Sequence, residues 1–170
     1  MTGSYEGNII PRTHLALRLG ERKYVCDLVS VQEIVLYPDI DPIGTDPGTF
    51  IGTFDSARGS IPVLDLLGRP FDAESIRRKI LVIAGLSAHT IGILVDELLE
   101  NMGIELSSVL PLPVGAYGVS YEILQGVVDF ETETYYLINL ERLAATWQDE
   151  FHPAGKGTKV SEGNGEDTIL

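Results

Sequence analysis

Histidine and cysteine are the residue types in this sequence that most often bind metals or act in catalysis, and their spacing supports neither role. His14, His89 and His152 stand far apart, and none belongs to an H-E-x-x-H motif, which places two imidazoles on one face of a helix. Cys26 is the only cysteine, which excludes a cysteine-rich zinc site. It lies in an apolar segment, where a buried, inert thiol is expected. We expect surface or structural roles for the three histidines.

The acidic segment Asp39-Ile40-Asp41-Pro42-Ile43-Gly44 begins like a calcium-binding loop. Ile43 stands where a third oxygen ligand is needed, and Phe50 stands where the loop requires a bidentate glutamate. The segment Gly118-Val119-Ser120-Tyr121-Glu122 lacks the second glycine of a nucleophile elbow, and no phosphate-binding glycine motif is present. The sequence therefore predicts a solvated acidic turn and no metal, cofactor or catalytic residue.

The formal net charge is −13 at pH 7, from 25 acidic and 12 basic residues. Binding to a phosphate backbone or to an anionic membrane draws on clustered lysines and arginines. The basic residues here are scattered, and the densest group, Arg77-Arg78-Lys79, abuts a predicted strand, where we expect a solvated edge. The charge argues against nucleic acid and membrane surfaces and leaves proteins as the expected partners.

The chain length of 170 residues suits one domain or two small fused lobes, and a hydrophobic share of 44% is enough to bury a core. No apolar run reaches the roughly 20 residues that span a membrane. The N-terminus lacks the pattern of a signal peptide, and the lone cysteine forms no intrachain disulfide. We expect a cytoplasmic protein without direct membrane insertion.

Short apolar segments separated by glycine, proline and aspartate predict a β-rich chain. Strands are expected at residues 14–19, 24–28, 50–54, 60–64, 79–85, 90–95, 123–130 and 135–138. Residues 1–12 are expected to be a flexible N-terminus and residues 151–170 a disordered acidic tail, so that the domain itself spans residues 13–150.

Capping residues predict short helices between these strands. Ser30-Val31-Gln32-Glu33 has the form of a capping box, so a helix of about two turns is expected to begin there and to end before Pro38. Asp65 is expected to cap a short helical turn over residues 66–71, and Asp96 a further short helix. Asn139 is expected to cap the longest helix, which has a stripe of apolar residues for burial at Leu140, Leu143, Ala144 and Trp147.

Two units of the sequence are alike, which indicates an internal duplication across a polar link at residues 72–78. Gly52 stands thirteen residues before Asp65, and Gly126 stands thirteen residues before Asn139. Further alike are Pro62-Val63-Leu64-Asp65-Leu66 with Tyr136-Leu137-Ile138-Asn139-Leu140, and Tyr24–Val31 with Ile91–Leu98. Short strands close readily into small barrels, because closure removes exposed edges. We expect a mainly β fold of two pseudo-symmetric small barrels packed together, with a single β-sandwich as the alternative.

The order of motifs between His14 and Trp147 resembles that of the CheW-like family. The matching segments are Leu15–Gly20 with Tyr24, Val31–Ile34, Phe50-Ile51, Arg58-Gly59, Pro62–Leu66, Gly92–Asp96, Gly126–Val128 and Leu137–Leu143. This resemblance implies two intertwined five-stranded barrels of the Src-homology-3-like kind. It also implies a cytoplasmic adaptor without catalysis, which couples the cytoplasmic tip of a chemoreceptor to the regulatory domain of a CheA-type histidine kinase.

In the family, the receptor tip lies in an apolar groove between the barrels and the kinase domain docks end to end on one barrel. Transferred position by position, the resemblance implies partner contacts at Leu28, Val31, Glu33, Ile34, Arg58, Leu98 and Leu99. An apolar strip with one arginine suits a helix that binds in a groove. The apolar members of this set are equally suited to a core position, because short amphipathic segments bury their stripe.

The sequence departs from the family pattern near Arg58. Ser56 stands where the family has asparagine, and only Ser60-Ile61 separates Gly59 from Pro62, one residue fewer than usual. The turn that carries Arg58 is therefore expected to differ in direction. Two other functions remain as alternatives. One is a scaffold for a kinase array that governs surface motility or gene expression, and the other is a small β-barrel hydrolase dependent on an acid or on His14.

Overall fold

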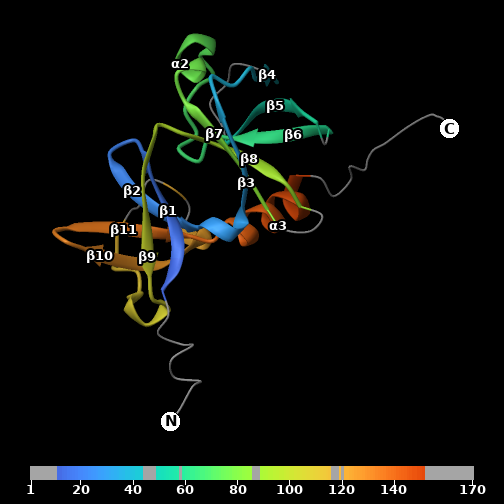
Figure 1. Cartoon of the computed structure of the whole chain (residues 1–170). Helices are drawn as coiled ribbons and strands as arrows, with labels where there is room; N and C mark the ends of the chain where they lie inside the picture. The colour runs from blue at the N-terminus through green and yellow to red at the C-terminus, as the bar shows by residue number, and fades with distance from the viewer. Residues whose placement is uncertain are drawn as a thin grey trace.

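The strands of the computed structural model, which describes residues 11–43, 49–57, 59–85, 89–115, 119 and 121–151, form two sheets. The first has the order β10-β11-β2-β1-β9 and comprises β1 (Arg12–Leu19), β2 (Arg22–Asp27), β9 (Glu97–Ile104), β10 (Leu124–Phe130) and β11 (Glu133–Ile138). The second has the order β3-β7-β8-β6-β5-β4 and comprises β3 (Val31–Leu36), β4 (Asp41–Pro42), β5 (Phe50–Ser56), β6 (Gly59–Leu64), β7 (Ile80–Ala84) and β8 (Ile91–Val95). Figure 1 shows the two sets of strands on different sides of the molecule.

Each sheet closes on itself, and we call the first barrel 1 and the second barrel 2. In barrel 2 the two ends of the strand order, β3 and β4, are consecutive in the chain and are joined at a bend where Tyr37 has a φ of 52°. In barrel 1, Leu110 exchanges two backbone hydrogen bonds of 2.8 and 2.9 Å with Val127 of β10 shortly after β9 ends. Closure pairs the edges that an open sheet would expose. The predicted pair of small barrels is confirmed, and the single sandwich is wrong.

The two barrels have matching strand orders, which confirms the internal duplication. The order β10-β11-β2-β1-β9 in barrel 1 corresponds to β5-β6-β8-β7-β3 in barrel 2, and each order contains one parallel pair, β11 with β2 and β6 with β8. Gly52 pairs with Val63 directly after a bulge, and Gly126 pairs with Leu137 directly after an equivalent bulge. The thirteen-residue repeat in the sequence therefore marks structurally equivalent positions.

The chain passes from one barrel to the other at two short crossovers (Figure 1). The chain leaves β2 of barrel 1 through the 3-10 turn η1 (Leu28–Ser30) and enters β3 of barrel 2. It returns from β8 of barrel 2 to β9 of barrel 1 through the single residue Asp96. We call these connections the η1 crossover and the Asp96 crossover. As a result, each barrel contains strands from both halves of the sequence.

Alternate residues of the strands between the barrels face different cores. Leu15 and Leu17 of β1 join a central core that contains residues of both barrels, whereas Ala16 between them joins the interior of barrel 1. In β7, Val82 joins the central core and Leu81 joins the interior of barrel 2. Burial on both faces explains why these strands are continuous apolar runs rather than alternating ones.

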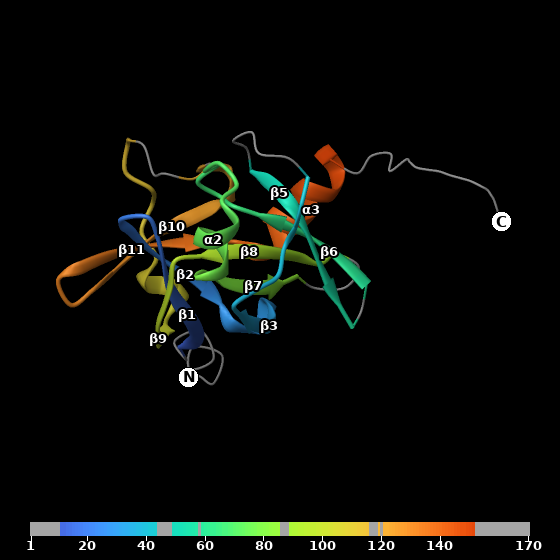
Figure 2. The ribbon, with the colours of Figure 1, turned by 90° about the horizontal axis from the view of Figure 1, so that it is seen from above.

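The C-terminal helix α3 (Leu140–Phe151), the longest of the described helices as predicted, packs its apolar residues into the central core. Figure 2 shows it on the barrel 2 side of the molecule, away from the turn of the β10–β11 hairpin. Asn139 caps the helix, with its side-chain oxygen accepting a hydrogen bond of 2.9 Å from the backbone N–H of Arg142. The Trp147 ring lies 4.8 Å, centroid to centroid, from the Phe50 ring of barrel 2. The predicted stripe of Leu140, Leu143, Ala144 and Trp147 is buried.

Two of the predicted short helices are wrong. The capping-box segment Ser30–Glu33 lies mainly in strand β3, because Val31–Leu36 pairs with β7, and the preceding η1 turn is capped instead by Asp27, which accepts from Val29 N. The segment after Asp96 is strand β9, which pairs with β1. In both places, long-range pairing with a strand of the other sequence half determines the structure.

The link at residues 72–78 contains a helix that the sequence analysis did not predict, α2 (Ala73–Arg77), and Asp72 caps it by accepting from the N–H groups of Glu74 and Ser75. Asp65 caps a turn at Leu66 and Leu67, which is shorter than the helical turn predicted over residues 66–71. The remaining 3-10 turns are η2 (Leu106–Ser108) and η3 (Tyr121–Ile123).

The expected N-terminal segment and acidic tail fall mostly at residues 1–10 and 152–170, which lie outside the described residues. Strand β1 begins at Arg12. Within the described residues, no helix combines the length and apolarity needed to cross a lipid bilayer.

Candidate functional site

The predicted partner-contact residues lie at the η1 crossover and on the two exchanged strands. Leu28 belongs to the crossover itself, and Val31, Glu33 and Ile34 belong to β3. Leu98 and Leu99 lie on β9, the strand of barrel 1 that corresponds to β3. Arg58 lies outside the described residues.

Burial divides these residues into three groups. Leu28, Val31 and Leu98 are half-buried and pack against the central core, so they combine core contact with accessible surface. Leu99 packs instead against the interior of barrel 1, because neighbouring residues of a strand point to opposite faces. Glu33 and Ile34 are exposed, Ile34 by 39%.

Next to these residues is an exposed apolar surface that the sequence analysis did not identify. Val29 is 62% exposed at the η1 crossover, and Leu36 and Tyr37, at the end of β3, are 61% and 76% exposed. Ile34 and Leu36 share one face of β3 because they stand two residues apart in a strand. The continuous apolar run Ile34-Val35-Leu36 was the available signal for a strand, and the helical interpretation of this segment concealed it.

Barrel 1 provides an internal comparison for this surface. Ile34 pairs with Val82, and its counterpart in barrel 1 is Asn101, which pairs with Leu15. In the same way, the counterpart of Leu36 is Gly103, and both Asn101 and Gly103 are exposed. The barrel architecture therefore tolerates polar or small residues at these positions, so it does not require the apolar side chains of β3.

A pocket of about 420 Å³ lies beside the η1 crossover. Its lining consists of Arg12, Thr13, Asp27, Leu28 and Val29. Arg12 and Asp27 form an ion pair with an Nη2–Oδ2 distance of 2.5 Å. The pocket therefore combines an apolar wall with a charged pair next to the half-buried Leu28.

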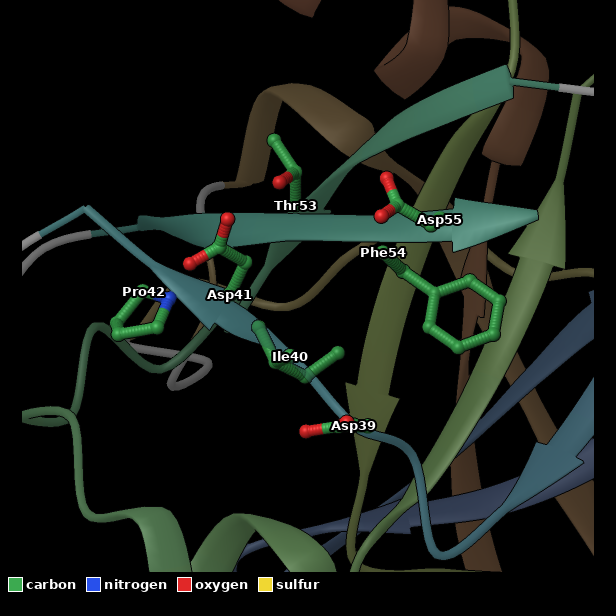
Figure 3. A pocket seen from close by; sticks show the side chains of 7 residues that line it. All are labelled: Asp39, Ile40, Asp41, Pro42, Thr53, Phe54 and Asp55. Atoms are coloured by element: carbon green, nitrogen blue, oxygen red, sulfur yellow. The ribbon is translucent and has the colours of Figure 1, made fainter.

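A second pocket, of about 500 Å³, lies between β4 and the end of β5 and is lined by Asp39, Ile40, Asp41, Pro42, Thr53, Phe54 and Asp55 (Figure 3). Its three carboxylates are exposed and do not converge on one point (Figure 3). No group of three or more histidine, cysteine or acidic residues in the described part of the chain could hold a metal ion. The carboxylates of the predicted acidic turn are exposed, and Asp41-Pro42 within it forms the short strand β4, which pairs with β5.

Among the described residues, His14 and Cys26 are buried. His14 is buried inside barrel 1, with Nδ1 2.9 Å from the carbonyl oxygen of Arg12, and His89 is half-buried. His152 lies outside the described residues. Burial, together with the nearby Asp27 charge, raises the pKa of the Cys26 thiol to about 12, so the thiol stays protonated at neutral pH.

The strongest polar cluster in the described structure surrounds the Asp96 carboxylate. Asp96 accepts hydrogen bonds from Gly20 N at 2.6 Å and Lys79 Nζ at 2.7 Å, and Arg69 Nη1 lies 3.1 Å from both of its oxygens. Arg69 also donates to Asp65, through Nε at 2.9 Å and Nη2 at 3.2 Å. We call these five residues the Asp96 network.

The network determines the ionisation of Asp96. Burial opposes the charged form, but hydrogen bonds from Lys79, Gly20 and Arg69 outweigh this effect and lower the pKa of Asp96 to about 2. The carboxylate is therefore ionised over the whole physiological pH range. The network was not identified from the sequence, because its five residues are dispersed along the chain.

This pKa predicts a specific loss of stability in acid. A carboxylate with a folded-state pKa below its unfolded value stabilises the folded state above that unfolded value and loses this contribution as pH falls through the folded one. With allowance for solvent screening, the contribution of Asp96 is expected to be about 1–2 kcal/mol at pH 7, with about half of it lost by pH 3. Urea unfolding of the wild type and of Asp96→Asn at both pH values measures it. If the wild type and Asp96→Asn differed in free energy of unfolding by the same amount at both pH values, the lowered pKa of Asp96 would be contradicted.

Comparisons with known proteins bear on this geometry. A family model described as a CheW-like domain matches residues 13–147. The chain is similar to a probable chemotaxis protein CheW of Rhizobium etli, with 21% identity over 141 residues, 82% of this chain and 91% of the relative. It is also similar to a chemotaxis protein CheW of Klebsiella aerogenes, with 24% identity over 144 residues, 82% of this chain and 86% of the relative.

Among solved structures, the scaffolding protein TtCheW from Thermoanaerobacter tengcongensis superposes with a TM-score of 0.66. The superposition covers 79% of this chain and 92% of that chain, with 23% sequence identity. This likeness establishes the same fold.

Proposed function

Because this chain belongs to the CheW-like family of chemotaxis scaffold proteins, we propose that it is a non-catalytic adaptor that couples chemoreceptors to a CheA-type histidine kinase. The observation that carries the proposal is the exposed apolar surface of Ile34, Leu36 and Tyr37 on barrel 2. Its counterpart in barrel 1 is polar or small at Asn101 and Gly103. Exposed apolar side chains that the fold does not require are typical of a protein-binding surface.

The receptor tip is proposed to bind across Leu28, Val31 and Leu98. These side chains rest on the central core, which holds them in place, while their accessible parts offer apolar area to a partner helix. The exposed carboxylate of Glu33 lies on the same strand and is suited to fix the register of a helix that carries a basic residue. Contacts by Arg58 and Leu99 stay predictions, and the inward packing of Leu99 favours a supporting role.

The regulatory domain of the kinase is proposed to dock end to end on barrel 2. Leu36 and Tyr37 are exposed where the chain bends between β3 and β4, and Ile43, directly after β4, is 58% exposed. A second barrel with an apolar end would cover these side chains. Tyrosine is enriched among the few residues that supply most of the binding energy at protein interfaces, and the buried centre of an interface is more apolar than its rim.

The Ile34→Asp variant tests this proposal. A charge buried in an apolar contact is strongly unfavourable. The affinity for at least one of the two purified partners, the receptor tip or the kinase regulatory domain, is therefore expected to fall at least about thirtyfold. Titration calorimetry with each partner measures the affinity, and co-sedimentation with both tests formation of the ternary complex.

Asn101→Asp is the matched control, because Asn101 is exposed at the equivalent position of barrel 1. Its affinities are expected to stay within about twofold of those of the wild type. If the wild type binds both partners and Ile34→Asp binds them with the same affinities, the surface around Ile34 is not the binding site. A wild-type protein that binds neither partner would refute the coupling function itself.

A further inference from the structure

The Asp96 crossover is the point where the chain passes from barrel 2 to barrel 1 through one residue. The Asp96 side chain is only 8% exposed, and its backbone N–H donates to the carbonyl oxygen of Arg18 in β1 at 3.0 Å. Glu97, the next residue, pairs with the side chain of Arg18 at an Nε–Oε1 distance of 3.1 Å. A change in the geometry of Asp96 would therefore change how β9 enters barrel 1.

The donors to the Asp96 carboxylate come from both barrels. Gly20 belongs to the turn between β1 and β2 of barrel 1, whereas Lys79 directly precedes β7 of barrel 2. Arg69 extends the connection to Asp65 at the end of β6. Charge-assisted hydrogen bonds depend strongly on direction, unlike the apolar contacts of the central core. The network therefore restrains rotation of one barrel against the other more sharply than core packing does.

The polar contacts at the η1 crossover are of a different kind, because Asp27 pairs with Arg12 of the same barrel and the Ser30 carbonyl accepts a backbone hydrogen bond of 2.9 Å from Gly85 N. Within the described structure, no carboxylate at this crossover receives side-chain donors from both barrels.

Val31 and Leu98 are equivalent positions, because Val31 pairs with Ala84 and Leu98 with Leu17, each directly before a bulge. Two residues before them stand Val29 and Asp96, which are therefore equivalent to each other. Val29 is 62% exposed, whereas the Asp96 carboxylate is buried in its network.

From this asymmetry we infer that Asp96 and Arg69 are positioning residues that fix the angle between the two barrels and so hold Leu98 in place relative to Leu28 and Val31. Leu98 follows Asp96 by two residues, whereas Leu28 and Val31 belong to the other crossover and its strand. The effect on a partner rests on the proposed function, but the effect on the angle between the barrels is a property of the protein alone.

The test measures the distance between the barrels directly. Gln125 of β10 in barrel 1 and Ser60 of β6 in barrel 2 are exposed, and cysteines at both positions can carry spin labels for pulsed electron resonance. The native Cys26 does not compete for the label, because it is buried and its thiol stays protonated. The distance distribution is recorded for the labelled parent, for Asp96→Asn and for Arg69→Gln.

Val128→Ala is the control, because Val128 is buried in the interior of barrel 1 and its truncation lowers stability without touching the network. Asp96→Asn and Arg69→Gln are expected to shift or broaden the distance distribution and to weaken binding of the receptor tip at least about tenfold. Val128→Ala is expected to lower the melting temperature and to leave the distribution and the affinity unchanged.

Several outcomes would overturn the inference. One is a distribution unchanged in both network variants, and another is a change of the same size in Val128→Ala. A third is an altered distance distribution with unchanged affinity for the receptor tip, in a protein whose wild type binds that tip. If Asp96→Asn does not fold, Arg69→Gln decides the question, because Lys79 and Gly20 N still pair with Asp96 in that variant. A wild-type protein that does not bind the receptor tip would refute the proposed function, while the distance result would stand.

Discussion

Replacement of Trp147 by alanine is expected to lower the free energy of unfolding by about 3–5 kcal/mol. Trp147 is 2% exposed, belongs to the central core and contacts the Phe50 ring of barrel 2. Its removal would leave a cavity beneath α3 that the closed barrels have little freedom to fill. Urea unfolding followed by circular dichroism measures the change.

Glu141→Ala on the same helix is the control, because Glu141 is exposed. Its cost is expected to stay below about 0.5 kcal/mol. A cost below about 1 kcal/mol for Trp147→Ala would mean that α3 contributes little to the central core. A large cost with retained secondary structure would establish the helix as part of the folded unit.

The Gly126→Ala variant is expected to lose about 2–3 kcal/mol, because a β-carbon at this position would overpack the closure of barrel 1. That atom would lie 2.4 Å from the carbonyl oxygen of Leu110 and 2.7 Å from Cγ1 of Val109. Leu110 forms the hydrogen bonds that close the barrel, so the clash cannot be relieved without loss of closure. For a chain of this size, the melting temperature is expected to fall by about 5–10 °C in calorimetry.

Gly52→Ala provides a second measurement of the same effect, because its β-carbon would lie 2.2 Å from the carbonyl oxygen of Asp41 in barrel 2. Gly103→Ala is the control, since its nearest contact is the side chain of Pro11 at 3.2 Å. Equal stability of the Gly103 and Gly126 variants would contradict the close approach of backbone at the closure. A similar loss at Gly52 and Gly126 would show that the duplicated glycines perform the same task.

The strands were largely predictable because each is a short apolar run bounded by turn residues. The pairing was predictable in part, because the repeat of Gly52 and Gly126 preserves the bulge and register of two hairpins. The exchanged strands β3 and β9 were not. A capping signature at Ser30 is a local signal, whereas the pairing of Val31 with Ala84 depends on a strand that is far away in the sequence.

The candidate site was predictable only where the sequence analysis assigned the correct secondary structure, because that assignment decides which residues share a face. Leu28, Val31 and Leu98 pack at the central core as half-buried residues, which the sequence left open between core and groove. The helix predicted from the capping box at Ser30 would have placed Ile34 and Leu36 on different faces, whereas strand β3 places them on the same face. The Asp96 network escaped prediction for a different reason. Its ion pairs join residues that only the exchange of strands brings together.

The exchange of strands has a consequence for the order in which the newborn chain acquires structure. Strands β3–β8 form a continuous stretch, so barrel 2 is complete once the ribosome has released Val95. The β1–β2 hairpin emerges first, yet it must wait for β9–β11 before barrel 1 can close. Pairing between strands that are far apart in the sequence slows folding, and apolar surface stays exposed until the pairing forms. Barrel 1 therefore closes later during synthesis than barrel 2, although its hairpin β1–β2 is made before any strand of barrel 2.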